Sequence, residues 1–163
     1  MADLFGQGAH QVRFDWGPVG ALAVEADVVA VVDVLSFSAC ITVAVERGIE
    51  VYPYRWRDAS AEAYAERLDA VLARGRSHTQ PSLSPAALLS CDPVPRLVLP
   101  SPNGSTICTL LDERGCSVGI GGVRNARAAG EWLAAAVRAG RTVAVIAAGE
   151  RWESDDSLRP ALE

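Results

Sequence analysis

An acidic residue at the end of a long apolar run is the strongest chemical signal in this sequence. The run Val28–Val32 contains only valine and alanine, and Asp33 follows it directly. A short turn with two hydroxyl groups, those of Ser36 and Ser38, then leads into a helical pattern. A carboxylate at the end of a buried strand is costly unless it is solvated, paired or bound to a cation. Because ligands of open α/β sheets bind at the carboxyl ends of the strands, Asp33 is the first candidate for chemistry.

Three further junctions between a strand pattern and a helix pattern are also rich in small polar residues. They are Ser101-Pro102-Asn103-Gly104-Ser105, Gly121-Gly122-Val123-Arg124-Asn125, and the stretch from Ala148 through Glu150 to Ser157. If the strands are parallel, all four junctions lie at one sheet edge, where helix N-termini favour an anion such as phosphate. Each junction alone also fits an ordinary cap or turn. The prediction of a site therefore depends on the four occurring together.

Carboxylates at two of these junctions indicate a metal ion. Asp33 and Glu150, with Glu163 further along the chain, offer the oxygen ligands that select Mg²⁺. Bound Mg²⁺ would polarise a phosphoryl oxygen and help to generate hydroxide from water. The simpler interpretation of Asp155 and Asp156 is that they cap a final helix. A solvated loop position is the corresponding alternative for Glu150.

Several other reaction classes lack the residues they need. All fifteen basic residues are arginine, so a Walker A loop and Schiff-base chemistry both lack their lysine. Leu35 stands where a haloacid-dehalogenase-type phosphatase needs a second aspartate, which disfavours Asp33 as a covalent nucleophile. The cysteines have no C-x-x-C spacing, so we expect reduced thiols and no zinc site.

Arg124 could clamp a phosphate as a fork, or lie on the surface at a helix start. His78 is better interpreted as an exposed loop residue than as a base.

Composition restricts the partners and the location. The net charge of −5 argues against a non-specific nucleic-acid binder. No apolar run reaches about 18 residues and no secretory leader is visible, so we expect a cytoplasmic protein without a membrane partner. The expected partner is a small-molecule phosphoester, and exposed helix faces would permit a homo-oligomer. The 163 residues suit a single domain over residues 1–163. Its last helix is expected to be cut short at Glu163, with a frayed terminal turn as the alternative.

Hydrophobic periodicity predicts an α/β fold. Strands are expected over 21–25, 28–35, 50–54, 96–100, 116–120 and 142–148, with residues 1–20 irregular. Helices are expected over 38–47, 58–74, 103–111 and 124–139, with a short helix at 85–89 inside a long loop and a final helix from about 157. This alternation is typical of a three-layer α/β/α sandwich with a largely parallel or mixed sheet.

At these positions the sequence resembles the 2-phosphosulfolactate phosphatase (ComB) family. The run VVDVLSFS around Asp33 is similar to the family's V-x-D-V-L-R-A-T/S, and Ser84-Pro85 falls where the family has Asn-Ser-Pro. The run SPNGS around Asn103 is similar to its T/S-x-N-G-T/S, and Asn125-Ala126 to its helix-opening N-A. The run AAGE around Glu150, followed by LRPALE at the end, matches the start of the family's last motif.

The resemblance implies a three-layer fold and Mg²⁺-dependent hydrolysis of (R)-2-phospho-3-sulfolactate to sulfolactate and phosphate, as in coenzyme M biosynthesis. It implies catalytic roles for Asp33, Asn103 and Glu150, and metal binding by Asp33, Glu150 and Glu163. The resemblance extends substrate binding to Gly104, Ser105, Arg124 and Asn125, and we also expect the hydroxyl groups of Ser36, Ser38 and Ser84 to bind the substrate.

Two departures from the family pattern keep a second function open. Ser36 stands where the family usually has arginine, and Leu83 replaces the asparagine of Asn-Ser-Pro. The alternative to an enzyme is therefore a catalytically silent binder of a phosphorylated or sulfonated metabolite. A Mg²⁺-dependent hydrolase acting on a different phosphoester is the other alternative.

Overall fold

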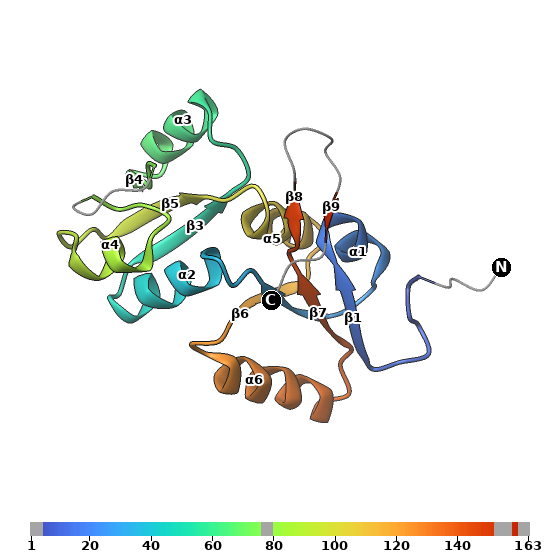
Figure 1. The fold of residues 1–163 in the computed structure, drawn as a ribbon. Coiled ribbons are helices and arrows are strands. Elements are labelled where there is room, and N and C mark those ends of the chain that lie inside the picture. Colours follow the sequence, from blue (N-terminus) through green and yellow to red (C-terminus); the bar gives the residue numbers. More distant parts are fainter. Residues whose placement is uncertain (1–4, 76–79, 152–157, 160–163) are drawn as a thin grey trace.

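Strands and helices alternate along the chain in a computed structural model, which describes residues 5–75, 80–151 and 158–159. Every strand pair in its two larger sheets is parallel, which confirms the predicted α/β class (Figure 1). The elements are β1 (Val12–Trp16), α1 (Gly17–Ala23), β2 (Val28–Val32), α2 (Phe37–Glu46), β3 (Glu50–Tyr54), α3 (Ala59–Arg67), β4 (Val71–Leu72), α4 (Pro85–Ser90), β5 (Arg96–Pro100), α5 (Gly104–Glu113), β6 (Ser117–Gly121), α6 (Ala126–Arg138), β7 (Val143–Ala147), β8 (Glu150–Arg151) and β9 (Leu158–Arg159).

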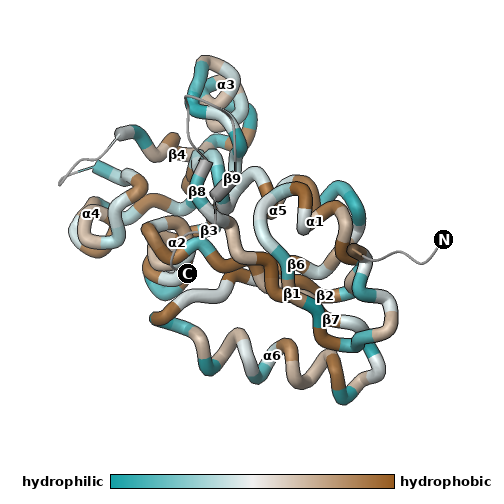
Figure 2. Tube along the Cα trace, turned by 45° about the vertical axis from the view of Figure 1, so that its right-hand side comes forward, coloured by the Kyte–Doolittle hydropathy of each residue, from teal (hydrophilic) through white to brown (hydrophobic). Residues whose placement is uncertain are grey.

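The larger sheet has four strands in the order β1-β7-β2-β6. Helix α6 covers one face, and α1 and α5 pack together on the other, so this part of the molecule has three layers (Figure 1). The central strand β2 is buried along its length up to Val31 because both faces are covered. The hydrophobic stretches of the chain gather where this sheet lies between its helices (Figure 2). Such double coverage explains why the sequence of β2 is apolar without alternation.

A second sheet of three strands, in the order β3-β5-β4, lies beside the first (Figure 1). Helix α5 joins the two sheets, because it contacts β2 and β6 of the larger sheet and β3 of the smaller one. One hydrophobic cluster includes residues of both sheets, among them Val31 on β2 and Leu99 on β5. The expectation of a single sheet edge was therefore wrong for β5. The junction after β5 nevertheless meets the junction after β2, because α5 packs against both sheets.

The N-terminal prediction was wrong. Residues 12–16 form an edge strand and Gly17–Ala23 form a helix, where the sequence predicted irregular chain and then a strand at 21–25. The sequence did not predict strand β1 because the usual burial of apolar residues and exposure of charged residues is reversed in it. Val12 and Phe14 are exposed, whereas Arg13 between them is buried. Burial of Arg13 is possible because its guanidinium donates to the backbone carbonyls of His10 and Gly8. Proline at position 18 suits the first turn of a helix, which explains α1.

Two further segments differ from prediction. Helix α3 ends at Arg67 instead of continuing to 74, because Asp69 takes a left-handed φ of 50° and Val71–Leu72 then pairs with β5. The final helix predicted from about 157 is replaced at Leu158–Arg159 by strand β9, which pairs antiparallel with β8. Asp155 and Asp156, its predicted caps, lie outside the described residues.

Strand β2 ends at Val32, earlier than the predicted end at 35, because the chain turns at Asp33 toward α2. The remaining predicted elements are confirmed to within about two residues at either end, and 50–54 and 96–100 match their strands fully. Within the described part of the chain, no helix has the length and apolar character needed to cross a membrane.

Candidate functional site

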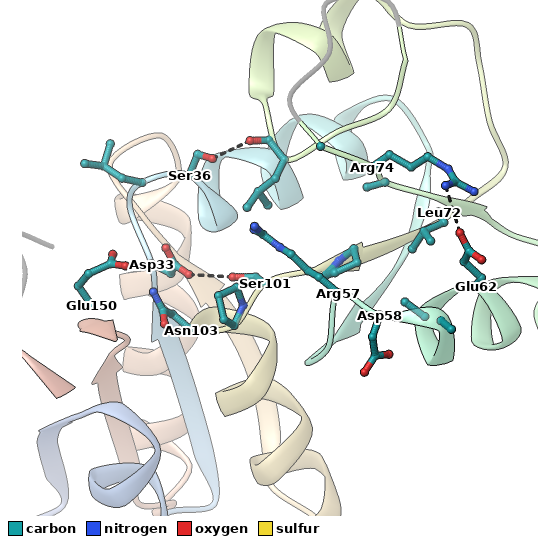
Figure 3. A pocket seen from close by; sticks show the side chains of 18 residues that line it. Asp33, Ser36, Arg57, Asp58, Glu62, Leu72, Arg74, Ser101, Asn103 and Glu150 are labelled. Carbon is teal, nitrogen blue, oxygen red and sulfur yellow. Dashed lines mark hydrogen bonds and ion pairs between the residues drawn. The ribbon is translucent and has the colours of Figure 1, made fainter. Parts of the chain in front are cut away.

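A cleft of about 930 Å³ opens where the carboxyl ends of strands from both sheets meet. Asp33 follows β2, Ser101–Asn103 follow β5, and Arg57 follows β3, while Glu150 lies just beyond β7 (Figure 3). This is the edge at which parallel sheets bind ligands. The charged side chains that line the cleft are Asp33, Asp58, Glu62, Glu150, Arg57 and Arg74.

Asp33 is held firmly at the base of this cleft. It is 6% exposed, and its Oδ2 accepts hydrogen bonds from the Gly104 N–H at 2.9 Å and from the Ser101 hydroxyl at 3.4 Å. The first donor lies at the N-terminus of α5, where the helix dipole favours a negative charge. The backbone of Asp33 is fixed as well, because its N–H donates to the Ser38 hydroxyl at 3.0 Å. These contacts give the carboxylate a single orientation.

Glu150 brings a second carboxylate to the same place. Its side chain is exposed, and Figure 3 shows its carboxylate pointing toward Asp33. A cation bound between two neighbouring carboxylates would offset their mutual repulsion. Glu163, the third predicted metal ligand, lies outside the described residues. Within the described ranges, no group of three or more His, Cys, Asp or Glu residues could hold a metal ion.

Asn103 adds an oxygen that is not used elsewhere in the described structure. Its Oδ1 is buried and has no hydrogen-bond partner among the described residues, and the side chain does not cap α5 although Asn103 occupies the N-cap position. A buried polar atom without a partner is uncommon, and a water, an ion or a ligand can satisfy it. Asp33, Asn103 and Glu150 all line the cleft, and their oxygens are of the type that Mg²⁺ takes in proteins, where it commonly uses one or two carboxylates together with water and substrate phosphate.

Ser36 also lines the cleft, but its hydroxyl has a structural contact. It donates to the backbone carbonyl of Leu83 at 3.0 Å and so ties the turn after Asp33 to the segment before α4. The position at which the resembling family has arginine therefore carries no positive charge and contacts the protein itself.

Three predicted substrate-binding hydroxyls support the fold instead. Ser38 accepts the backbone N–H of Asp33, Ser84 caps α4 by accepting the Ala87 N–H, and Ser105 donates to the Leu99 carbonyl at 2.9 Å. Ser38 and Ser105 are at most 1% exposed. None of the three lines the large cleft. Gly104 acts on the cleft through its backbone, as the donor to Asp33.

Arg124 and Asn125 lie in a different place from the one predicted. They line a second, smaller pocket of about 330 Å³ beside α2. Arg124 is paired with Glu46, and the Asn125 side-chain amide donates to the Ile120 carbonyl at 2.7 Å. The predicted single crevice is thus two pockets, because β6 follows β2 in the larger sheet whereas β5 lies in the smaller one.

Sequence reasoning missed the cationic side of the cleft. Arg57 and Arg74 line it, and Arg74 is paired with Glu62 at 3.1 Å. A signal for Arg57 is present in the sequence, because Arg57 lies between strand β3 and the next helix, as the four polar junctions lie between a strand and a helix. This junction did not indicate a site because it contains no glycine and its sequence is typical of the start of a helix.

The cysteines are free thiols, as expected, and the deeply buried ones are unsuited to nucleophilic chemistry. Burial raises the pKa of Cys40 to about 11 and that of Cys108 to about 12, and the nearby charge of Asp33 acts in the same direction. A raised thiol pKa leaves less thiolate at a given pH. At pH 8 the thiolate fractions are on the order of 10⁻³ and 10⁻⁴.

We therefore expect iodoacetamide at pH 8 to label the partly exposed Cys116 first, and Cys40 and Cys108 only after denaturation in urea. Mass spectrometry of the alkylated peptides measures the order. Labelling of native Cys40 at the rate of Cys116 would contradict the assignment of Cys40 to the closed interior.

No protein-family model matches the chain, and no curated protein matches its sequence significantly. The likeness to the 2-phosphosulfolactate phosphatases consequently depends on the short motifs alone.

Proposed function

We propose that this protein is a Mg²⁺-dependent phosphatase that hydrolyses the phosphate ester of a small sulfonated or carboxylated acid, of the 2-phosphosulfolactate type. The observation that carries the proposal is the pair of carboxylates, Asp33 and Glu150, that line one cleft at the carboxyl ends of parallel strands, with Glu150 pointing toward Asp33. The unpartnered Asn103 oxygen beside them supports an ion or ligand at this place.

The chain's own residues suggest distinct tasks. Asp33, fixed by Gly104 and Ser101, is suited to hold the cation, and Asn103 would add an oxygen ligand or contact the phosphate. When bound, Mg²⁺ would neutralise charge on the phosphoryl oxygens and lower the pKa of a bound water. Glu150 is exposed, so it can accept a proton from the attacking water and pass it to solvent.

In this scheme a water oxygen forms a bond to phosphorus in line with the ester oxygen, and the bond between phosphorus and that ester oxygen breaks. The departing alkoxide takes up a proton from solvent, which balances the proton that Glu150 passes to solvent, so the products are an alcohol and inorganic phosphate. The N-terminus of α5 lies at the cleft and favours the negative charge that gathers there.

A substrate panel tests the proposal. Purified protein with MgCl₂ is expected to release phosphate from 2-phosphosulfolactate or 2-phosphoglycolate, and to do so faster than from ethyl phosphate, which has no second acidic group. Phosphate release is measured colorimetrically. Binding of these compounds without phosphate release would instead favour the silent binder, and absence of both would refute the phosphate site.

A further inference from the structure

Arg57 is a cation aimed into the cleft from the loop between β3 and α3. Its side chain is exposed, and Figure 3 shows it extending toward the side of the cleft where Asp33, Ser36 and Ser101 lie. It reaches the cleft because the parallel strand β3 ends at Tyr54, on the same side of the molecule as the ends of β2 and β5.

The acids nearest to Arg57 in the sequence are already engaged. Asp58 caps α3, since its Oδ1 accepts the Ser60 N–H at 2.9 Å and also the Ser60 hydroxyl. These hydrogen bonds lower the pKa of Asp58. Glu62 is paired with Arg74 at 3.1 Å. Within the described ranges, Arg57 therefore has neither a hydrogen bond nor an ion pair.

The charges of the cleft are consequently divided between two regions. Asp33 and Glu150 form the acidic region, which with Mg²⁺ would take a phosphate group. Arg57 supplies a guanidinium that has no counter-ion among the described residues, and its planar donors match a carboxylate or a sulfonate. A molecule that carries a phosphate at one end and another acidic group at the other would complement both regions together.

We propose that Arg57 determines substrate specificity by binding the non-reacting acidic group, a carboxylate or sulfonate, of the phosphorylated substrate. This inference rests on the proposed function and extends it, because it assigns recognition of the second acid to a residue outside every motif of the sequence resemblance. It also gives the cleft a cation that the position of Ser36 does not supply.

Binding of two phosphonates that cannot be hydrolysed as phosphate esters tests the inference apart from catalysis. Phosphonoacetate has a phosphonate and a carboxylate, whereas ethylphosphonate has only the phosphonate. With MgCl₂, titration calorimetry is expected to show that the unaltered protein binds phosphonoacetate about 10- to 100-fold more tightly, the range typical of a charge-assisted hydrogen-bonded pair. Arg57→Gln is expected to bring this ratio close to one. Arg57→Lys, which keeps the charge but loses the planar fork, is expected to give an intermediate ratio.

Arg67→Gln is the matched control. Like Arg57→Gln, it removes one positive charge. Arg67 is at the end of α3, where it lies over the Tyr64 ring and does not line the cleft. It is expected to keep the binding ratio. Thermal melting of each variant verifies the fold, which the removal of the unbonded Arg57 side chain should not disturb.

Three results would overturn the inference. The first is that Arg57→Gln lowers the affinity for both phosphonates equally. The second is that the unaltered protein shows no preference for phosphonoacetate, and the third is that it binds neither compound. The failure of the proposed function has a different signature. A protein with an Arg57-dependent preference for phosphonoacetate that releases no phosphate from 2-phosphoglycolate would retain this specificity site and lose its assignment as a phosphatase.

Discussion

Asp33→Asn is expected to reduce phosphate release by about 10²- to 10⁴-fold, the range associated with losing an essential charged group in acid–base or metal-assisted catalysis. Asparagine has nearly the same shape, and its side-chain oxygen can still accept the Gly104 N–H. The hydrogen bond to a charged acceptor becomes one to a neutral acceptor, which costs about 1 kcal/mol of stability. The variant should therefore fold, and the change in activity should far exceed the change in stability. Steady-state kinetics with MgCl₂, combined with urea unfolding, separate the two effects.

Asp58→Asn provides the control for this variant. It makes the same chemical change in the same cleft, but Asp58 caps α3, and asparagine is as good an N-cap as aspartate. This variant is expected to keep its stability and most of its activity. A folded Asp33→Asn protein that works at the rate of the unaltered protein would refute the role given to Asp33.

Gly104→Ala is expected to damage both the fold and the site. A Cβ atom at this position would lie 2.3 Å from Cδ1 of Phe37 and 2.7 Å from Oδ2 of Asp33. Phe37 is fully buried, so it has little room to move. Either its ring or the start of α5 must shift, and the second shift removes the Gly104 N–H from Asp33. The expected loss is about 3 kcal/mol of unfolding free energy, or about 6–12 °C in melting temperature.

The same substitution at Gly130 should act in the opposite direction. Gly130 is exposed within α6, and an added Cβ would meet no atom within 4 Å. Gly130→Ala is expected to stabilise the protein by about 0.5–1 kcal/mol, because alanine loses less backbone freedom on folding. Equal stability of Gly104→Ala and the unaltered protein in urea unfolding would show that α5 does not approach Asp33 as closely as described.

The central strands and Asp33 could be predicted because burial on both faces makes β2 apolar and leaves its terminal charge conspicuous. Strand β1 could not be predicted in this way, since Arg13 is buried while Val12 is exposed, and hydrogen bonds to the carbonyls of His10 and Gly8 just before the strand offset the burial of its guanidinium. Hydrophobic alternation is a poor guide wherever such contacts invert it.

The site was predictable only in part for a similar reason. Strand ends indicated that Asp33, Asn103 and Glu150 would meet, and all three line one cleft. Sequence spacing does not say which strands share a sheet, so it could not separate Asn125 from Asn103. It also could not show that Arg57 has no acidic partner in the part of the chain that the structure describes, because this depends on Asp58 turning its carboxylate to the start of α3.

The metal dependence of phosphate release tests most directly whether the protein is a Mg²⁺-dependent phosphatase. Protein freed of divalent ions with EDTA and dialysed is titrated with MgCl₂ in the presence of 2-phosphoglycolate. We expect only background release without the metal, and a saturable rise in rate as Mg²⁺ is added. Asp33→Asn is expected to abolish this rise. Release at the same rate in EDTA, or no release at any Mg²⁺ concentration, would contradict this assignment.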